Sequence, residues 1–386
     1  MNIGKISNKN SPLITTNDVD IKPATLLDNY MKLAILITLA AYKKTDYIYV
    51  DDIFDKKINL KYLGNFMSYV VNHPIAPKKF NFNIQKNINM KHENNVKENF
   101  ECDVVLNFSG GIDSTAGLLY CLDKGLNVLP LWIDFGQKNI NAETEASNYI
   151  LKKLNKKSLK IKIDIQKQVT KGWKDWDFIV PGRNFIFAAV SNSVLRHSNN
   201  KKGKIFLCAV KEEMKKWKNR DKSKYFFTVS SRLFSKDSKK SIKLCSPFEM
   251  YSKTEVLYWW KHNWEKKYGI SPHDTSTCYY NFTKACGKCR ACLRRTISLL
   301  AAGYDIDDNL AIHPLSDPSN YIKNIWLPQI AAKKISRVGQ LDFYIAMEKC
   351  INILPPHLIE YCNNLPWQTL KAIDNRKKEI QNVNLK

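Results

Sequence analysis

The chain has 386 residues, 44% of them hydrophobic, which is enough to bury a full-sized core and to form two domains or one enlarged domain. Its formal net charge of +25 indicates either a basic surface that meets a polyanion or lysines spread over solvated faces. No stretch reads as a signal peptide, and the apolar run 31–42 is shorter than the roughly 20 residues of a membrane span. We therefore expect a cytoplasmic protein with no membrane partner, whose ten cysteines are reduced thiols or metal ligands.

Residues 1–100 are predicted to be an N-terminal extension whose role the sequence does not indicate. Apolar, helix-like blocks lie at 26–43 and 62–71. The run 31–42 within the first block could be buried in the core, against a partner or against a second copy of the chain. A homodimer is therefore one of the alternatives. An Asn- and Lys-rich stretch at 81–99 has little to bury, which indicates an edge strand or a linker.

From Asp103 onward, short apolar strands alternate with helical patterns. We expect strands at 104–107, 128–134, 159–165 and 204–210, and helices at 114–124, 143–154 and 184–196. Another helix should begin at Ser252, which has capping-box spacing to Glu255. This alternation predicts an α/β, Rossmann-like fold: a parallel sheet with helices on both faces. Residues 304–386 are helical and aromatic in pattern, with proline interruptions, and should form a C-terminal extension.

The sequence Ser109-Gly110-Gly111-Ile112-Asp113-Ser114 joins the first of these strands to a helix. In such a loop, backbone N–H groups and the positive end of the helix dipole converge on a phosphate, and glycine permits the close approach. The two serines can add hydroxyl donors, while Asp113 can orient a nucleotide or Mg²⁺. No lysine follows the second glycine as in a Walker loop, so transfer of a terminal phosphoryl group is disfavoured. The alternative is an ordinary tight turn.

Four cysteines lie close together in the sequence, with two or seven residues between neighbours: Cys278, Cys286, Cys289 and Cys292. This spacing suits a tetrahedral Zn²⁺ held by four thiolates, with Gly287 permitting the tight turn between them. A site closed by four thiolates has no open position for catalysis, so we interpret it as structural. An iron–sulfur cluster is the alternative metal centre, and four buried free thiols are the third interpretation.

The loop S-G-G-x-D-S resembles the pyrophosphate loop of the N-type ATP pyrophosphatases, whose fold is of the adenine nucleotide alpha hydrolase type. Within that superfamily, the cysteine run T-x-[ST]-C-Y…C-G-x-C-x-x-C-x-x-R resembles the C-terminal signature of the 7-cyano-7-deazaguanine synthase (QueC) family. Three further segments resemble that family in the same order: "DFGQ" at 134–137, "VPGRNFIF" at 180–187 and "PFEMYSKTEV" at 247–256. The resemblance places a QueC-like domain at 101–303.

The resemblance implies ATP, Mg²⁺ and Zn²⁺ as cofactors, and a role for each matching residue. Asp113, Lys253 and Arg183 would be catalytic, the last two as charge partners of the leaving pyrophosphate. The nucleotide would be bound by Ser109, Gly110, Gly111, Asp113, Ser114, Gln137 and Asn184. Taken alone, Arg183 and Asn184 could instead cap the helix that follows, and Lys253 could be a solvated lysine. Tyr279 and Tyr280 either stack on a deazapurine or pack internally.

The implied reaction is adenylation of the carboxylate of 7-carboxy-7-deazaguanine, followed by attack of an amine to give an amide or nitrile. Two departures leave the acceptor open, since either ammonia or a protein N-terminal amine could serve. The long terminal extensions are one departure. The other is the lysine-rich stretch 211–241, where the family usually has an acidic substrate loop and where Glu213 and Asp221 could replace the missing acids.

QueC-like proteins with such additions occur in antiphage operons of the CBASS and Qat types, which favours conjugation to a partner protein from the same operon. A tRNA-modifying enzyme of the thiolase or lysidine-synthetase type is the alternative activity, although a nucleic-acid partner is not favoured. A non-enzymatic zinc module is the third class.

Overall fold

The structure is a computed structural model that describes residues 14–17, 47–51, 60–71, 83–87, 101–134, 137, 139–163, 182–214, 220–238, 240–280, 284–305 and 310–385. The predicted apolar block at 26–43 lies outside these residues. The second block forms helix α2, Leu60–Val71. Part of the Asn- and Lys-rich stretch forms β3, Asn83–Asn87, which pairs in parallel with β2, Tyr47–Asp51. The edge-strand interpretation of that part is therefore confirmed.

A six-stranded sheet with the order β1-β6-β5-β4-β7-β8 forms the centre of the chain. Five of its strands are parallel, whereas β1 runs antiparallel to β6 and pairs Ile14 with Ile163. The strands are β1 Ile14–Asn17, β4 Val104–Asn107, β5 Val128–Asp134, β6 Leu159–Ile163, β7 Lys202–Phe206 and β8 Ser241–Cys245. The α/β, Rossmann-like prediction is confirmed, and β1 adds an edge strand from the N-terminal extension.

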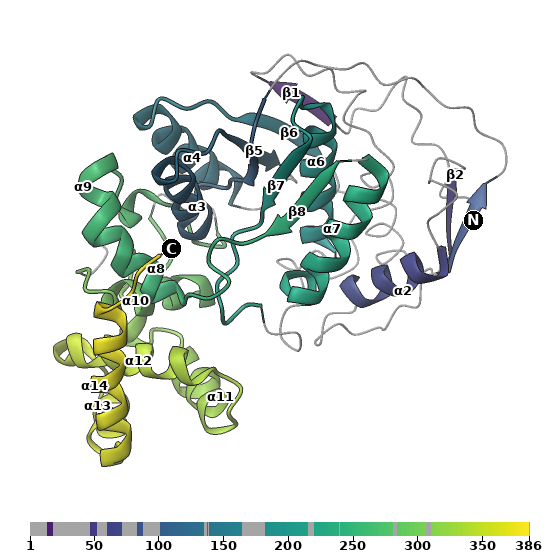
Figure 1. The fold of residues 1–386 in the computed structure, drawn as a ribbon. Helices are drawn as coiled ribbons and strands as arrows, with labels where there is room; N and C mark the ends of the chain where they lie inside the picture. Colours follow the sequence, from purple (N-terminus) through teal and green to yellow (C-terminus); the bar gives the residue numbers. More distant parts are fainter. Residues whose placement is uncertain are drawn as a thin grey trace.

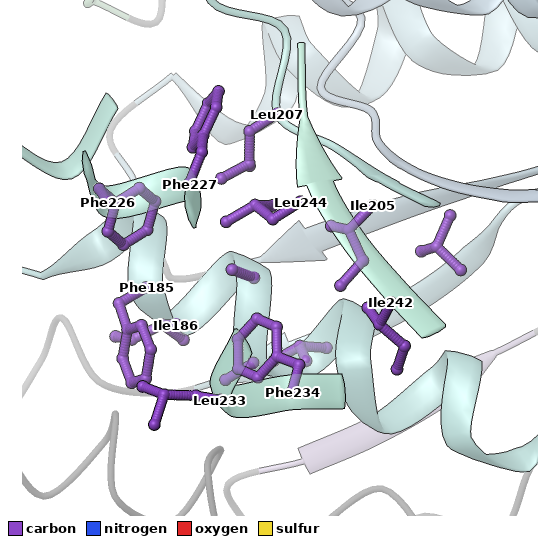
Figure 2. Packing of buried hydrophobic residues seen from close by; sticks show 14 of the residues in the cluster. Phe185, Ile186, Ile205, Leu207, Phe226, Phe227, Leu233, Phe234, Ile242 and Leu244 are labelled. Atoms are coloured by element: carbon purple, nitrogen blue, oxygen red, sulfur yellow. The ribbon is translucent and has the colours of Figure 1, made fainter. Parts of the chain in front are cut away.

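Helices cover both faces of this sheet (Figure 1). One face packs against α2, α6 (Arg183–His197) and α7 (Lys224–Ser238) through a cluster that includes Phe66, Phe185 and Phe226. Figure 2 shows α6 and α7 side chains meeting those of β7 and β8 in this cluster. The other face packs against α3 (Ile112–Asp123), α4 (Ile140–Lys153) and α8 (Lys253–Trp259).

A helical unit follows the sheet and has its own buried cluster, which includes Trp326, Phe343 and Ile373. In Figure 1 its helices gather at one end of the molecule, next to α8. They are α10 Arg290–Ala301, α11 Leu327–Ala331, α12 Arg337–Lys349, α13 Pro356–Asn363 and α14 Trp367–Gln381. The short helix α9, Glu265–Tyr268, precedes them. Within the described part of the chain, no helix is long and apolar enough to cross a membrane.

Two predicted features of the region 204–241 need correction. Strand β7 ends at Phe206 instead of Val210, because the parallel ladder with β8 stops there, although the Leu207 amide still donates to the Cys245 carbonyl. The lysine-rich stretch contains helix α7 and the start of β8, neither of which the sequence predicted. Phe226 and Phe227 of α7 are buried in the core, so the lysine-rich composition of the stretch concealed the apolar face of this helix.

Candidate active site

The order in which strands are added to the sheet reverses between the parallel strands β4 and β7. Strands β5 and β6 extend the sheet on one side of β4, and β7 and β8 extend it on the other. Ligands of open parallel sheets bind at such a switch point, beyond the carboxyl ends of the strands. A cavity of about 390 Å³ lies here, and its lining includes Asn107 and Ser109 at the end of β4 and Leu207 and Cys208 just after β7.

The glycine loop turns sharply at Gly110, whose φ of +72° lies in the left-handed region. A Cβ on Gly110 would lie 2.7 Å from the backbone nitrogen of Ser147 in α4, so glycine also permits close packing of the loop on that helix. The Ser114 hydroxyl accepts from the Ser109 amide at 3.2 Å and donates to the Gly111 carbonyl at 3.1 Å. The first turn of α3 has no side-chain cap, which suits an anion at this helix N-terminus.

Lys253, at the first position of α8, reaches the glycine loop. Its Nζ lies 2.9 Å from Asp113 Oδ2, and the two side chains are 18% and 27% exposed and line the cavity. The predicted capping box is confirmed: the Ser252 hydroxyl accepts from the Glu255 amide, and the Glu255 carboxylate accepts from the Ser252 amide. Lys253 is thus paired within the site, and the interpretation of a freely solvated lysine is wrong.

Arg183, Asn184 and Gln137 also line the cavity. The Asn184 side chain donates to the Asp221 carbonyl at 3.4 Å, and Gln137 donates to the Glu143 carboxylate at 2.7 Å. The residue that precedes α6 as its N-cap is Gly182 in the left-handed conformation, with no side-chain capping bond. The suggestion that Arg183 or Asn184 caps this helix is therefore wrong.

Three charged residues of the cavity wall were not predicted as site residues: Glu143, Lys222 and Arg294. Glu143 is half-buried, and desolvation raises the pKa of its carboxyl group, although hydrogen bonds from the side-chain amides of Gln137 and Asn139 partly offset this effect. Lys222 could not be identified among the many lysines around it. Arg294 follows Cys292 by two residues, and this proximity to the cysteine cluster could have identified it as a site residue from the sequence.

Glu213 lies on the cavity wall, while Asp221 contributes its backbone carbonyl. The Glu213 carboxylate is 2.9 Å from Lys222 Nζ and 3.7 Å from an Arg294 nitrogen. Burial alone would raise the pKa of Glu213, but the two cations more than offset this and lower it to about 2. Glu213 is therefore an ionised, paired carboxylate at neutral pH.

The four predicted cysteines come together beside this cavity. One ligand atom from each of Cys278, Cys286, Cys289 and Cys292 lies within 4.8 Å of the others. Tetrahedral Zn²⁺–thiolate bonds of about 2.3 Å require sulfur atoms roughly 3.8 Å apart, and the Cys286–Cys292 distance is 3.9 Å. Gly287, with φ of +69°, would place a Cβ 1.8 Å from the Ile312 carbonyl oxygen. The donor set and its geometry therefore fit a metal ion.

The cysteine cluster is joined to the glycine loop through residues 272–277. The Ser276 amide donates to the Gly110 carbonyl at 3.0 Å. Arg295, 4% exposed on α10, donates to the Pro272 and Thr275 carbonyls and to the hydroxyls of Thr275 and Thr277. Because α10 also carries Cys292, the cluster and Arg295 together fix the segment that contacts the loop.

These features define a class of α/β protein with a glycine-rich loop at the switch point of a parallel sheet and a four-cysteine cluster beside it. The family model described as Queuosine biosynthesis protein QueC matches residues 103–303, just over half of the chain. This chain belongs to the QueC family, which consists of ATP-dependent enzymes.

Similar proteins include 7-cyano-7-deazaguanine synthases from three organisms. The chain is 29% identical to the Picrophilus torridus protein over 219 residues, which are 52% of this chain and 87% of that protein. It is 23% identical to one from Sulfurisphaera tokodaii over 220 residues, 56% of this chain and 97% of that protein. The third, 7-cyano-7-deazaguanine synthase 1 of Desulfitobacterium hafniense, is 53% identical over 55 residues, a quarter of its length and 14% of this chain.

Proposed function

We propose that this protein uses ATP to activate the carboxylate of 7-carboxy-7-deazaguanine, releasing pyrophosphate. A carboxylate oxygen of the substrate attacks the α-phosphorus of ATP, and the bond from that phosphorus to the bridging oxygen breaks. An amine nitrogen then attacks the acyl carbon, loses a proton and displaces AMP. If ammonia is the amine, dehydration of the resulting amide by a second ATP gives the nitrile. The observation that carries the proposal is the convergence of the glycine loop, Lys253 and Arg183 on one cavity in a QueC-family chain.

The cavity residues supply what this reaction needs. Ser109, Ser114 and the uncapped N–H groups of α3 would hold the leaving pyrophosphate. Lys253 and Arg183 would balance the charge that develops on it. Mg²⁺, if it accompanies ATP, would lower the phosphate charge, and Asp113, the loop carboxylate that lines the cavity, would hold it. Asn184 and Gln137, which also line the cavity, would bind the nucleotide.

Tyr279 is the better candidate of the two tyrosines for stacking on the deazapurine. It is 40% exposed and lines the cavity beside Thr277. Tyr280 is similarly exposed but is not among the lining residues. An aromatic ring with one accessible face can stack on a purine-like base, so the two tyrosines should respond differently to replacement by alanine.

For the four cysteines we propose a structural Zn²⁺, because four thiolates complete its tetrahedral coordination and leave no position for substrate. Ligation would keep the segment 272–277 against the glycine loop. Metal analysis of the purified protein tests this assignment: zinc near one equivalent is expected. Iron together with labile sulfide would instead favour a thiolase-type cluster.

We further propose that the acceptor is the N-terminal amine of a partner protein from the same operon, in an antiphage role. This rests on the segments outside the family match, residues 1–102 and 304–386, and on the lysine-rich stretch 211–241. A protein acceptor needs a surface to bind it, and the additional segments supply such surface. Ammonia is the alternative acceptor, and its product would be the free nitrile.

The decisive experiment combines the protein with ATP, Mg²⁺ and 7-carboxy-7-deazaguanine, with and without ammonia, and follows products by mass spectrometry. AMP and pyrophosphate should appear only when the carboxylic acid is present, and Asp113→Asn and Lys253→Met should suppress both. Co-expression with the genomic neighbours, followed by intact-mass measurement of every chain, identifies the acceptor. Efficient release of free nitrile with no protein adduct would refute conjugation.

The net charge of +25 is the observation that favours the alternative, a tRNA-modifying enzyme. Phosphate contacts of a tRNA complex would make binding fall steeply with salt. Tight tRNA binding with a steep salt slope, together with turnover that depends on tRNA and not on the deazaguanine acid, would replace our first assignment.

A further inference from the structure

Arg376 is a buried arginine of the C-terminal helix α14 that reaches the start of α8. Its side chain is 1% exposed. The guanidinium donates to Asp342 Oδ1 at 2.9 Å, to the Ser252 hydroxyl at 2.7 Å and to the Glu255 carboxylate. Two of these three partners, Ser252 and Glu255, are the residues that form the capping box of α8.

Asp342 of α12 makes a second contact with the same turn. Its Oδ2 accepts from the Thr254 hydroxyl at 2.6 Å, and Thr254 is fully buried. Ser252, Thr254 and Glu255 are thus all held by residues that lie beyond the family match, which ends at residue 303. Lys253, which lies between Ser252 and Thr254 in the sequence, lines the cavity.

Several carboxylates surround the Arg376 guanidinium, so the first turn of α8 should be sensitive to the loss of this cation. Burial raises the pKa of Asp342 and raises that of Glu212 to about 7, and Arg376 lowers both. Glu379 adds a fourth carboxylate, 3.3 Å from the guanidinium. Without the cation, Asp342 and Glu255 would keep their hydrogen bonds from Thr254 and Ser252 but would lose their ion-pair partner, and breaking a buried pair in this way is strongly destabilising.

We propose that Arg376 is a positioning residue: it fixes the first turn of α8 and thereby the place of Lys253 at the glycine loop. The path is continuous, from Arg376 to Ser252 and Glu255, and through the 2.9 Å contact of Lys253 with Asp113 to the loop. Anion binding by a family domain therefore depends on a side chain from the C-terminal extension. The inference rests on the proposed function only in taking pyrophosphate as the anion of the loop.

The test uses the full-length chain with inorganic pyrophosphate as the probe, titrated by calorimetry. Arg376→Met should weaken pyrophosphate binding by about tenfold or more, the loss typical of removing one hydrogen bond to a charged group. Arg376→Lys keeps the charge but cannot hold all three partners, so an intermediate loss is expected. Amide hydrogen exchange should speed up at 252–256 and also at 109–115, which Arg376 does not touch.

Two comparisons separate positioning from general stability. Tyr344→Phe removes hydroxyl bonds to Tyr361 and Gln340 within the same helical unit, so it should lower the melting temperature without changing pyrophosphate affinity. In a Lys253→Met background, Arg376→Met should cost little further affinity, because the residue through which it acts is already absent.

Unchanged pyrophosphate affinity and unchanged loop exchange in Arg376→Met would overturn the inference, as would a full additional loss in the Lys253→Met background. If Arg376→Met does not fold, Arg376→Lys decides the question by the same measurements. If the unaltered protein binds no pyrophosphate, the proposed role of the loop is wrong, while hydrogen exchange at 109–115 still decides whether Arg376 controls it.

Discussion

Replacing Gly110 with alanine perturbs the glycine loop at its tightest point. An alanine with φ near +72° costs about 1–2 kcal/mol, because its Cβ crowds the following carbonyl oxygen. At this position the Cβ would also lie 2.7 Å from the Ser147 nitrogen and 3.2 Å from the Glu143 carbonyl oxygen, both backbone atoms of α4. Overpacking of this kind typically costs about 1–3 kcal/mol more.

Gly125→Ala is the matched control. Gly125 has φ of +64°, but a Cβ there would meet nothing within 4 Å. In a domain of this size, each kcal/mol lowers the melting temperature by about 2–4 °C. Gly110→Ala should therefore melt about 2–12 °C below Gly125→Ala in calorimetry and should lose pyrophosphate release, which Gly125→Ala keeps. Equal melting temperatures and equal activities would refute the steric argument.

Three further predictions concern the surroundings of the loop. Cys289→Ser should reduce the zinc content measured by mass spectrometry to well below that of the unaltered protein and lower the melting temperature; full zinc occupancy would contradict four-thiolate ligation. Arg295→Met should lower the free energy of unfolding by about 3–5 kcal/mol, since several buried acceptors lose a charged donor, and a loss below about 1 kcal/mol would contradict this. Because the pKa of Glu213 is lowered to about 2 from 4.5, its ion pair stabilises the fold fully above about pH 5 and is lost as the pH falls toward 2. The melting-temperature gap between the unaltered protein and Glu213→Gln should therefore be largest at neutral pH and close on acidification, and a gap independent of pH would exclude this ion pair as its cause.

The parts of the site that the sequence predicted depend on short-range patterns. Strands β4 and β5 have the predicted bounds, since each is a short apolar run that ends at a polar residue. The cysteine cluster was predictable because fourteen positions separate its first ligand from its last, and its spacing limits the chemistry. The capping box of α8 likewise spans only four residues.

The parts that the sequence could not predict depend on contacts between distant residues. Lys253 and Asp113 are 140 positions apart, and Arg376 is 121 positions from Glu255. Nothing in a single sequence distinguishes Arg376 from the other basic residues of its helix, because burial and pairing arise only when α14 packs against α12 and α8. Helix α7 was missed for a related reason: its sequence mixes exposed lysines with Phe226 and Phe227, and these two rings become buried only when the helix packs against the sheet.

The antiparallel strand β1 has a practical consequence for work with shortened chains. It pairs along β6, which would otherwise form an edge of the six-stranded sheet. An uncovered edge presents a row of unpaired N–H and C=O groups, which is a template for joining with the edge of another molecule. A chain that begins at residue 103, where the family match starts, would expose β6 in this way. Residues 14–17 cover this edge of the sheet, so a shortened chain should retain them.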